Sequence, residues 1–200
     1  MNNRTVVVLG LCGLASSALA QNFSLTLVPS AQTIDTSAGA VTMTMTVFGD
    51  ADVGTHMWEG AFAIESDSSN VIDMSWTPAL WSAFNVDGGF AGNGNYNEII
   101  FGHLTLGGIF PPFPGSELGM EIGSFEVTLS GTGLVEFELL PGSMFTLEIV
   151  DQITGNLFYD TNGTLSLEST QLQLVPSSSV GSVLAVAGLV VIRRRRSTTY

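Results

Sequence analysis

The sequence predicts an all-β protein, folded as an antiparallel β-sandwich between residues 21 and 175. Short runs in which apolar residues alternate with polar ones recur along this stretch. That pattern is typical of strands with one face in a core and the other in water. Glycine, proline, asparagine and aspartate separate the runs, as turns between strands require. The stretch has no cysteine, so a hydrophobic core must hold the fold without disulfides.

The first twenty residues have the layout of a secretory signal peptide. Arg4 supplies a positive charge, an apolar run begins at Val6, and small residues close on Ala18 and Ala20 as an A-x-A cleavage site. Residues 1–20 are therefore predicted to be a signal-peptide helix that is removed on export. Gln21 would then be the first residue of the mature chain.

The strands follow in order from Gln21. Residues 41–47 alternate apolar side chains with threonine, and residues 135–139 alternate apolar side chains with glutamate. Such alternation predicts strands with threonine or glutamate facing water. The other expected strands are 23–27, 57–65, 71–76, 99–106, 124–129, 145–149 and 164–167.

The connections are also predicted. Thr77 before Pro78 is typical of a helix start and predicts a short helix over residues 79–83. Asn162 before Gly163 favours a hairpin turn. Two long loops are expected at residues 85–97 and 107–119, and in a sandwich such loops are where binding residues usually lie.

Charge is the strongest compositional signal. All 18 Asp and Glu residues lie in residues 21–175, and all five Lys and Arg residues lie outside them, so this body has a formal charge of −18 with neutral histidines. A nucleic-acid partner is excluded, because phosphate binding needs Lys or Arg. The carboxylates must be solvated, hydrogen-bonded or bound to cations. Adaptation to a saline habitat and metal binding both remain open.

Two groups of oxygen ligands are candidates for Ca²⁺, a cation that prefers carboxylate and amide oxygens. The twelve residues 87–98 begin with aspartate and end with glutamate, as an EF-hand loop does, but lack side-chain oxygens at its third and fifth positions. A looser site is possible there. The candidate ligands are Asp87, Asn93, Asn95 and Glu98, and a second acidic pair is Asp50 and Asp52.

Aromatic residues give the candidate carbohydrate site. Trp58 and Trp76 are expected in the core, whereas Trp81 and Tyr96 border the predicted loop 85–97 and are candidates for stacking on a sugar. No catalytic residues are predicted: the chain has two histidines and no nucleophile motif, so it is not expected to be an enzyme.

The end of the chain contains an apolar run and a cluster of arginines. A helix over residues 180–192 would be roughly 20 Å long, against ~30 Å for the hydrocarbon core of a bilayer. The arginines would hold the C-terminus on the cytoplasmic side. The residues of the candidate sorting signal are Val175, Pro176, Arg193, Arg194, Arg195 and Arg196.

This tail resembles the PEP-CTERM sorting signal of bacteria, although the usual Pro-Glu-Pro is Pro-Ser-Ser here. The resemblance implies that an exosortase-like enzyme recognises residues 176–200. It also implies that the C-terminal helix anchors the chain in the membrane, transiently or permanently, during delivery to the cell surface or extracellular matrix.

The body loosely resembles cohesin-like bacterial modules, which are jelly-roll sandwiches that bind dockerins, and related modules that bind carbohydrate. The likeness lies in the "GDADVG" turn, the "WEGAFAIESDSSNVIDMSW" strand pair and the "IGSFEVTL" strand. The expected function is that of a secreted, surface-sorted, non-enzymatic protein of the cell surface or exopolysaccharide matrix. The alternatives are a carbohydrate-binding module or a polysaccharide hydrolase.

Overall fold

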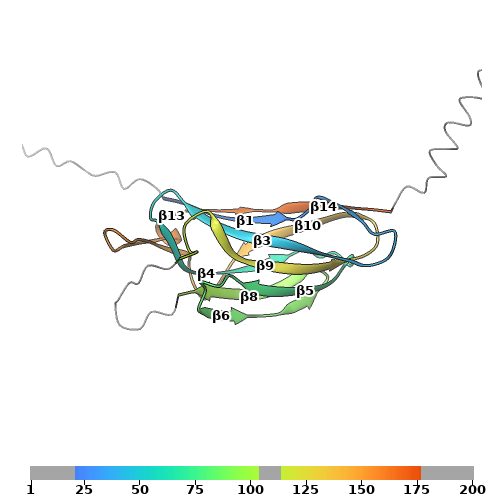
Figure 1. The fold of residues 1–200 in the computed structure, drawn as a ribbon, viewed down its shortest axis with the longest axis horizontal. Coiled ribbons are helices and arrows are strands. Elements are labelled where there is room, and N and C mark those ends of the chain that lie inside the picture. The colour runs from blue at the N-terminus through green and yellow to red at the C-terminus, as the bar shows by residue number, and fades with distance from the viewer. Residues whose placement is uncertain (1–20, 104–113, 177–200) are drawn as a thin grey trace, which may run out of the picture.

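The computed structural model describes residues 21–103 and 114–176, which form two β-sheets packed face to face (Figure 1). The first sheet has five strands in the order β13-β1-β3-β9-β5. Its strands are β1 (Gln21–Pro29), β3 (Val41–Ala51), β5 (Val71–Pro78), β9 (Met120–Leu129) and β13 (Gly163–Glu168).

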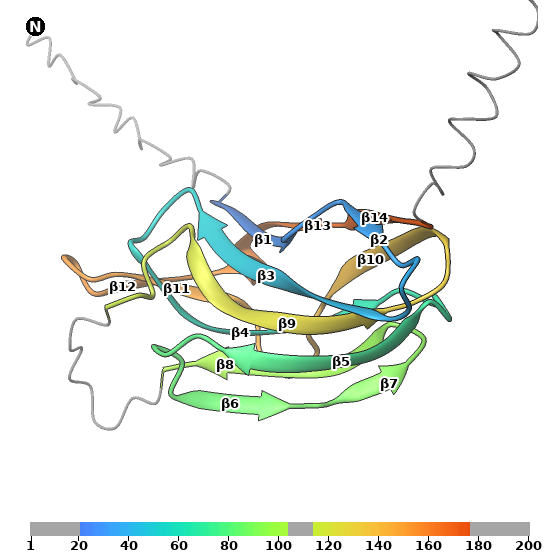
Figure 2. The same ribbon diagram turned by 45° about the vertical axis from the view of Figure 1, so that its right-hand side comes forward.

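The second sheet has nine strands and is centred on β4 (His56–Glu65). Its main path is β12-β11-β4-β10-β14-β2, and β8 lies on the other side of β4, followed by β6 and β7 (Figure 2). The remaining strands are β2 (Thr33–Asp35), β6 (Phe84–Asp87), β7 (Phe90–Gly92), β8 (Asn95–Gly102), β10 (Gly133–Pro141), β11 (Glu148–Asp151), β12 (Asn156–Tyr159) and β14 (Thr170–Val175).

The chain crosses repeatedly between the sheets, so neither sheet is built from consecutive strands alone. β1 pairs in parallel with β13, and β14 pairs in parallel with β2, while the other named strand pairs are antiparallel. The predicted antiparallel sandwich is therefore confirmed, with a parallel strand pair in each sheet as an addition.

The core forms where the alternating patterns predicted it. On β3, Met43, Met45 and Val47 are buried, while Thr42 and Thr44 are exposed. On β10, Val135, Phe137 and Leu139 are buried and the glutamates between them face water. Aromatic rings fill the centre between the sheets, with Phe62 contacting Trp76, Phe101 and Phe125 edge-on or tilted.

The helix predicted over residues 79–83 is wrong. Thr77 and Pro78 end strand β5, where they pair with Ser124 and Gly123 of β9, so the expected helix start is held in extended backbone. Ser82 N donates to Ala79 O at 2.9 Å, which closes a turn rather than a helix. The sheet pairing outweighs the local preference for a cap.

Two other predicted connections are also corrected. Residues 85–97 are not a long loop, because β6 and β7 pair with β8 and Asn93-Gly94 makes the tight turn between β7 and β8, both with positive φ. Asn162-Gly163 is not a hairpin turn. The short 3₁₀ helix Asp160–Asn162 carries the chain from β12 in one sheet to β13 in the other. The strand expected at residues 145–149 begins only at Glu148.

The signal-peptide helix of residues 1–20 and the anchor helix of residues 180–192 lie outside the described residues, as do residues 104–106 of a predicted strand. Within the part of the chain that the structure describes, there is no helix long and apolar enough to cross a membrane.

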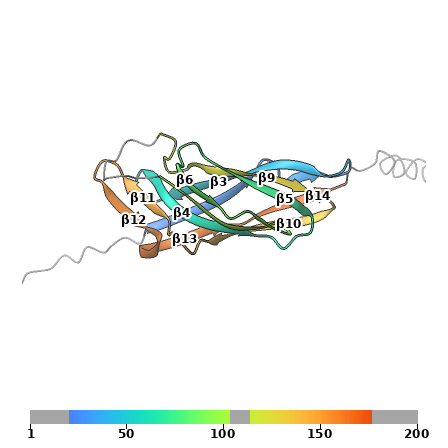
Figure 3. The same cartoon turned by 90° about the horizontal axis from the view of Figure 1, so that it is seen from below.

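The ends of the described chain lie at opposite ends of an elongated sandwich (Figure 3). Gln21 begins β1 near Asp52, whose backbone N–H donates to Asn22 O. Val175 ends β14 beside Asp35 and Thr36. These two ends correspond to the finish and the start of β3, so the chain leaves the sandwich far from where it enters.

Candidate functional site

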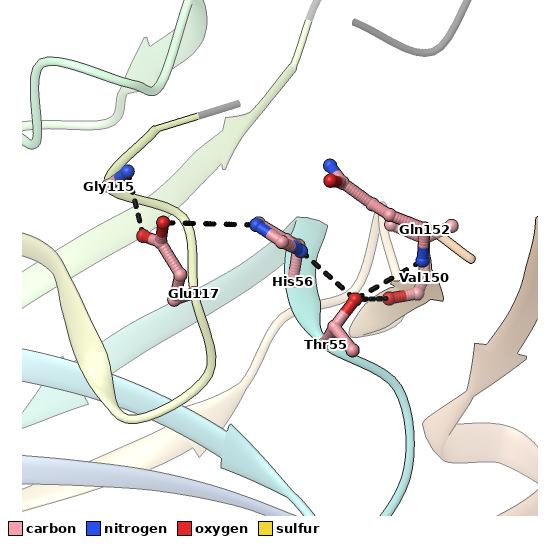
Figure 4. Close-up of polar contacts among 6 residues, drawn as sticks. All are labelled: Thr55, His56, Gly115, Glu117, Val150 and Gln152. Carbon is pink, nitrogen blue, oxygen red and sulfur yellow. Dashed lines mark hydrogen bonds and ion pairs between the residues drawn. The ribbon is translucent and has the colours of Figure 1, made fainter. Parts of the chain in front are cut away.

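Both histidines of the chain lie at the end of the sandwich where β4 begins. Figure 4 shows the His56 ring between Thr55 and Glu117. Its Nδ1 is 3.0 Å from Thr55 Oγ1, and its Nε2 is 3.9 Å from Glu117 Oε1. The other carboxylate oxygen of Glu117 accepts a hydrogen bond from Gly115 N at 2.7 Å. His56 and Glu117 also form an isolated backbone bridge.

The Thr55 hydroxyl fixes the role of this network. Its Oγ1 donates to Val150 O and accepts from Gln152 N, both at 3.2 Å, and its remaining lone pair faces His56 Nδ1 (Figure 4). The hydroxyl thus lies within hydrogen-bond distance of a carbonyl, a backbone N–H and the imidazole at once. The network therefore ties the start of β4 to the end of β11 and to residues 114–119.

The second histidine, His103, is buried beside two tryptophans. Its ring centroid lies 5.8 Å from that of Trp58 and 4.9 Å from that of Trp81. Burial, with a smaller effect from the charge of His56, lowers the pKa of His103 to about 4. A neutral His103 ring therefore serves as packing behind Trp81.

An open pocket of about 610 Å³ lies in front of Trp81. The turn of residues 79–82 and the end of β5 form one wall, and the segment before β9 forms the other. Trp81 Nε1 donates to Glu121 O at 2.9 Å, which fixes the indole at the pocket wall. The lining residues are Thr77, Pro78, Ala79, Leu80, Trp81, Pro114, Gly115, Met120 and Glu121.

Acidic side chains gather on the outer face of the nine-stranded sheet. Glu148 of β11 lies directly opposite Glu59 of β4, and Glu138 of β10 lies directly opposite Glu65 of β4. Burial, followed by the charge of Glu59, raises the pKa of Glu148 to about 7. Burial also raises the pKa of Glu59. Like charges paired across strands cost stability unless a proton or cation intervenes.

The structure does not bring the predicted calcium ligands of residues 87–98 together around one point. Asp87 Oδ1 accepts hydrogen bonds from Tyr96 and from Gly89 N. Asn95 Oδ1 accepts from Ser66 N and Asp67 N. Asn93 makes the turn after β7.

Glu98 binds a different part of the chain. Its carboxylate accepts hydrogen bonds from Ser143 N, Ser143 Oγ and Met144 N, and these bonds lower its pKa. The four predicted ligands are thus distributed among turns and a contact with residues 143–144.

The second predicted pair of calcium ligands, Asp50 and Asp52, does lie around one cavity. Asp50 and Asp52 line one cavity of about 140 Å³ with Asn22, Ser24 and Ser166. Asp52 accepts a hydrogen bond from the Asn22 amide, and Asp50 accepts one from Ala51 N. Across the described ranges, 21–103 and 114–176, no three His, Cys, Asp or Glu side chains are grouped as a metal ion would require. The calcium site stays a prediction.

The carbohydrate prediction needs a correction at Tyr96. This residue is only 3% exposed and packs in the core against Phe125, so its ring cannot stack on a sugar. It was expected at a loop border because β7 and the turn before β8 were not predicted. Trp81 does line a pocket, and its indole is the aromatic ring among the described residues of that lining. Trp58 and Trp76 are buried, as predicted.

Sequence reasoning missed the contact between His56 and Glu117, since the two residues are far apart in the chain and form no motif. The sorting-signal residues are mostly beyond the structure: Val175 ends β14, Pro176 follows it, and Arg193 to Arg196 lie outside the described residues.

Comparison with known proteins gives a fold but no sequence family. No family model matches the chain, and no curated protein matches it. The seventh ScaB type I cohesin from Pseudobacteroides cellulosolvens matches with a TM-score of 0.51 over 78% of this chain and 95% of that one. The fold is cohesin-like. The sequences are 8% identical, so this likeness concerns the fold alone.

Other solved cohesins match less closely. A cohesin module of a Clostridium perfringens family 33 glycoside hydrolase has a TM-score of 0.47 and 13% identity, covering 79% of this chain and 98% of that one. A cohesin from a Clostridium thermocellum cohesin–dockerin complex has a TM-score of 0.47 and 8% identity, covering 76% of this chain and 99% of that one.

Proposed function

We propose that this protein is an exported, surface-sorted, non-enzymatic module that binds a protein partner. The observation that carries the proposal is the cohesin-like sandwich. The resemblance of the sequence to cohesin-like modules, which bind dockerins, supports the same class of partner. The His56 network supports a structural role, because Thr55 links the start of β4 to Val150 and Gln152 at the end of β11.

The partner surface is basic. Residues 21–175 contain no Lys or Arg and carry a formal charge of −18. The His56 ring lies 3.9 Å from the Glu117 carboxylate, and no Lys or Arg of the body is there to pair with the other carboxylates. A partner bearing Lys or Arg would supply the opposite charge and would associate faster at low salt. The acidic outer face of the nine-stranded sheet, where Glu65 lies opposite Glu138 and Glu59 lies opposite Glu148, is the surface proposed for such a partner.

The proposed cellular location rests on both ends of the sequence. A signal peptide at residues 1–20 supports export, and the PEP-CTERM-like tail at residues 176–200 supports recognition by an exosortase-like enzyme. The tail would hold the chain in the membrane before or instead of processing. The mature protein would then belong to the cell surface or the extracellular matrix, with polysaccharide as a neighbour.

The sorting part is tested by replacing Arg193, Arg194, Arg195 and Arg196 together with serine. Cell fractionation should show that the variant no longer reaches the cell surface. Intact mass spectrometry should show that its C-terminal tail has not been cleaved. Replacing the same four residues with lysine keeps the charge and is the matched control. Unchanged mass and location in the serine variant would show that the tail is not a sorting signal.

The binding part is tested by capture from the surface fraction of the producing cells with the full chain as bait. A basic protein should be retained at low salt and released as salt is raised. A bait with Glu65→Gln and Glu138→Gln should retain less of it. Retention of polysaccharide instead of protein would favour the carbohydrate-binding alternative, and release of sugar fragments would favour the hydrolase.

A further inference from the structure

We propose that the pocket in front of Trp81 docks a partner segment in which an apolar side chain is flanked by Lys or Arg. This inference rests on the proposed protein-binding function, and it names a contact surface and its chemistry. The pocket lies at the end of the sandwich where β5 ends and β9 begins.

Apolar side chains at the pocket are left in contact with water. Leu80 is fully exposed, at 107%, and Met120 is 50% exposed. Pro78, Ala79 and Pro114 complete the apolar wall. A volume of about 610 Å³ has room for one or two side chains of a partner. Burying Leu80 and Met120 against an apolar side chain would remove their contact with water.

The pocket is already shaped for binding. Trp81 is held by its hydrogen bond to Glu121 O and by packing on His103. The turn is fixed by Ala79 N donating to Ile122 O at 3.2 Å. Opposite it, Glu117 holds Gly115 N and contacts His56. Walls fixed before binding lower the ordering cost that a partner must offset.

Charge identifies what flanks the apolar side chain. Glu121 lines the pocket and Glu117 lies two residues beyond Gly115, while residues 21–103 and 114–176 include no Lys or Arg to balance them. A partner cation beside the apolar side chain supplies that balance. A sugar fits less well, because among the described lining residues the polar side chains are those of Thr77 and Glu121 and the aromatic ring is that of Trp81.

The test follows the three indole N–H signals of the ¹⁵N-labelled full chain by NMR. The tryptophans are Trp58, Trp76 and Trp81, and a Trp81→Phe variant assigns the third signal. The probes are acetylated pentapeptide amides: Lys-Lys-Phe-Lys-Lys, Lys-Lys-Ser-Lys-Lys and Glu-Glu-Phe-Glu-Glu, together with a β-1,4-linked glucose hexasaccharide. Only the first peptide should shift the Trp81 signal with saturation, and the Trp76 signal should stay in place.

Two substitutions separate the apolar and charged parts. Leu80→Ser should weaken binding of the lysine–phenylalanine peptide at least fivefold with an unchanged melting temperature, since Leu80 is fully exposed. Glu121→Gln should weaken it severalfold and reduce its salt dependence. Leu134→Ser is the control, because Leu134 is 67% exposed on β10, away from the pocket.

Any of four results with the probes would overturn the proposal: no saturating shift with any peptide, equal binding of the serine peptide, preferential binding of the hexasaccharide, or concentration-dependent self-association that Leu80→Ser abolishes. If the Leu80→Ser bait captures the cellular partner as well as the parent does, the pocket inference fails while the proposed function stands. If the parent captures no protein, the proposed function fails.

Discussion

The hydroxyl of Tyr96 joins the two sheets at their open edge. It donates to Asp87 Oδ1 of β6 at 2.7 Å and accepts from Trp76 N of β5 at 3.2 Å. Burial, with the hydrogen bond to Asp87, raises the pKa of Tyr96, so the phenol stays protonated. Tyr96→Phe should therefore lower the free energy of unfolding by about 1–3 kcal/mol, because it leaves a buried N–H without its acceptor.

Urea unfolding of the full chain measures this loss, with the denaturant slope expected to stay unchanged. Asp87→Asn keeps an acceptor oxygen for the phenol and should cost less. Equal stability of Tyr96→Phe and the parent would mean that the hydroxyl does not link the sheets.

Tyr96 also shows where sequence reasoning stops at the residue scale. The alternation on β3 and β10 was enough to place Met43, Met45, Phe137 and their neighbours in the core. The surroundings of Tyr96 depend on Asp87 and Trp76, which come from other strands and reach it only through the sheet packing. Local pattern carries no information about such contacts, so Tyr96 was wrongly placed at the surface.

At the element scale, the pairing of β4 with β11 should make stability depend on pH. The pKa of Glu148 is about 7 in the folded chain, against 4.5 for an ordinary glutamate. Between these values Glu148 binds more protons in the folded state than in the unfolded state, so its contribution to the free energy of unfolding falls as pH rises from 4.5 to 7. Glu148→Gln should remove most of that fall, about 1–2 kcal/mol, leaving the part due to Glu59.

Thermal melts across this pH range measure the effect, with Glu138→Gln as the control from the other cross-strand glutamate pair. His103 gives the opposite slope: its pKa is about 4 when folded and 6.5 otherwise, so stability falls as pH drops from 6.5 to 4. The parent should be most stable at about pH 5–6. If the Glu148→Gln variant lost as much thermal stability toward pH 7 as the parent does, Glu148 would not be the source of that loss.

The connections between strands were harder to predict than the strands themselves. Periodicity located most strands, but Thr77-Pro78 and Asn162-Gly163 carried turn or cap preferences that the fold does not follow. β5 is kept extended by pairing with β9, and Asp160–Asn162 bridges two sheets. Long-range pairing decides between such local alternatives, and a single sequence does not show it.

At the scale of the whole molecule, salt should stabilise the fold. With 18 carboxylates and no Lys or Arg in the body, the folded state brings like charges together, and salt screens their repulsion. Sodium chloride should raise the melting temperature by a few degrees, an amount on the order of 1 kcal/mol. Calorimetry of the full chain at several ionic strengths checks this, and no rise would contradict the repulsion argument.

Calcium needs a separate comparison at matched ionic strength. The predicted site at Asp87 and Glu98 would show as an increment above sodium chloride that Asp87→Ala with Glu98→Ala abolishes. Both carboxylates already accept hydrogen bonds within the protein, so we expect calcium to stabilise the fold no more than sodium chloride does at the same ionic strength. An increment that survives the double substitution would direct attention to Asp50 and Asp52.

The chain leaves the sandwich at Val175, at the end opposite Trp81 and His56. This arrangement sets the distance between the tail and the proposed docking pocket. β3 runs between these two ends and has 11 residues, so they are about 35 Å apart. If the chain is tethered through its tail, as proposed, the proposed docking pocket lies at the end of the sandwich that is farther from the membrane. A bulky partner then meets it in open medium, without entering the crowded layer at the base of the tether.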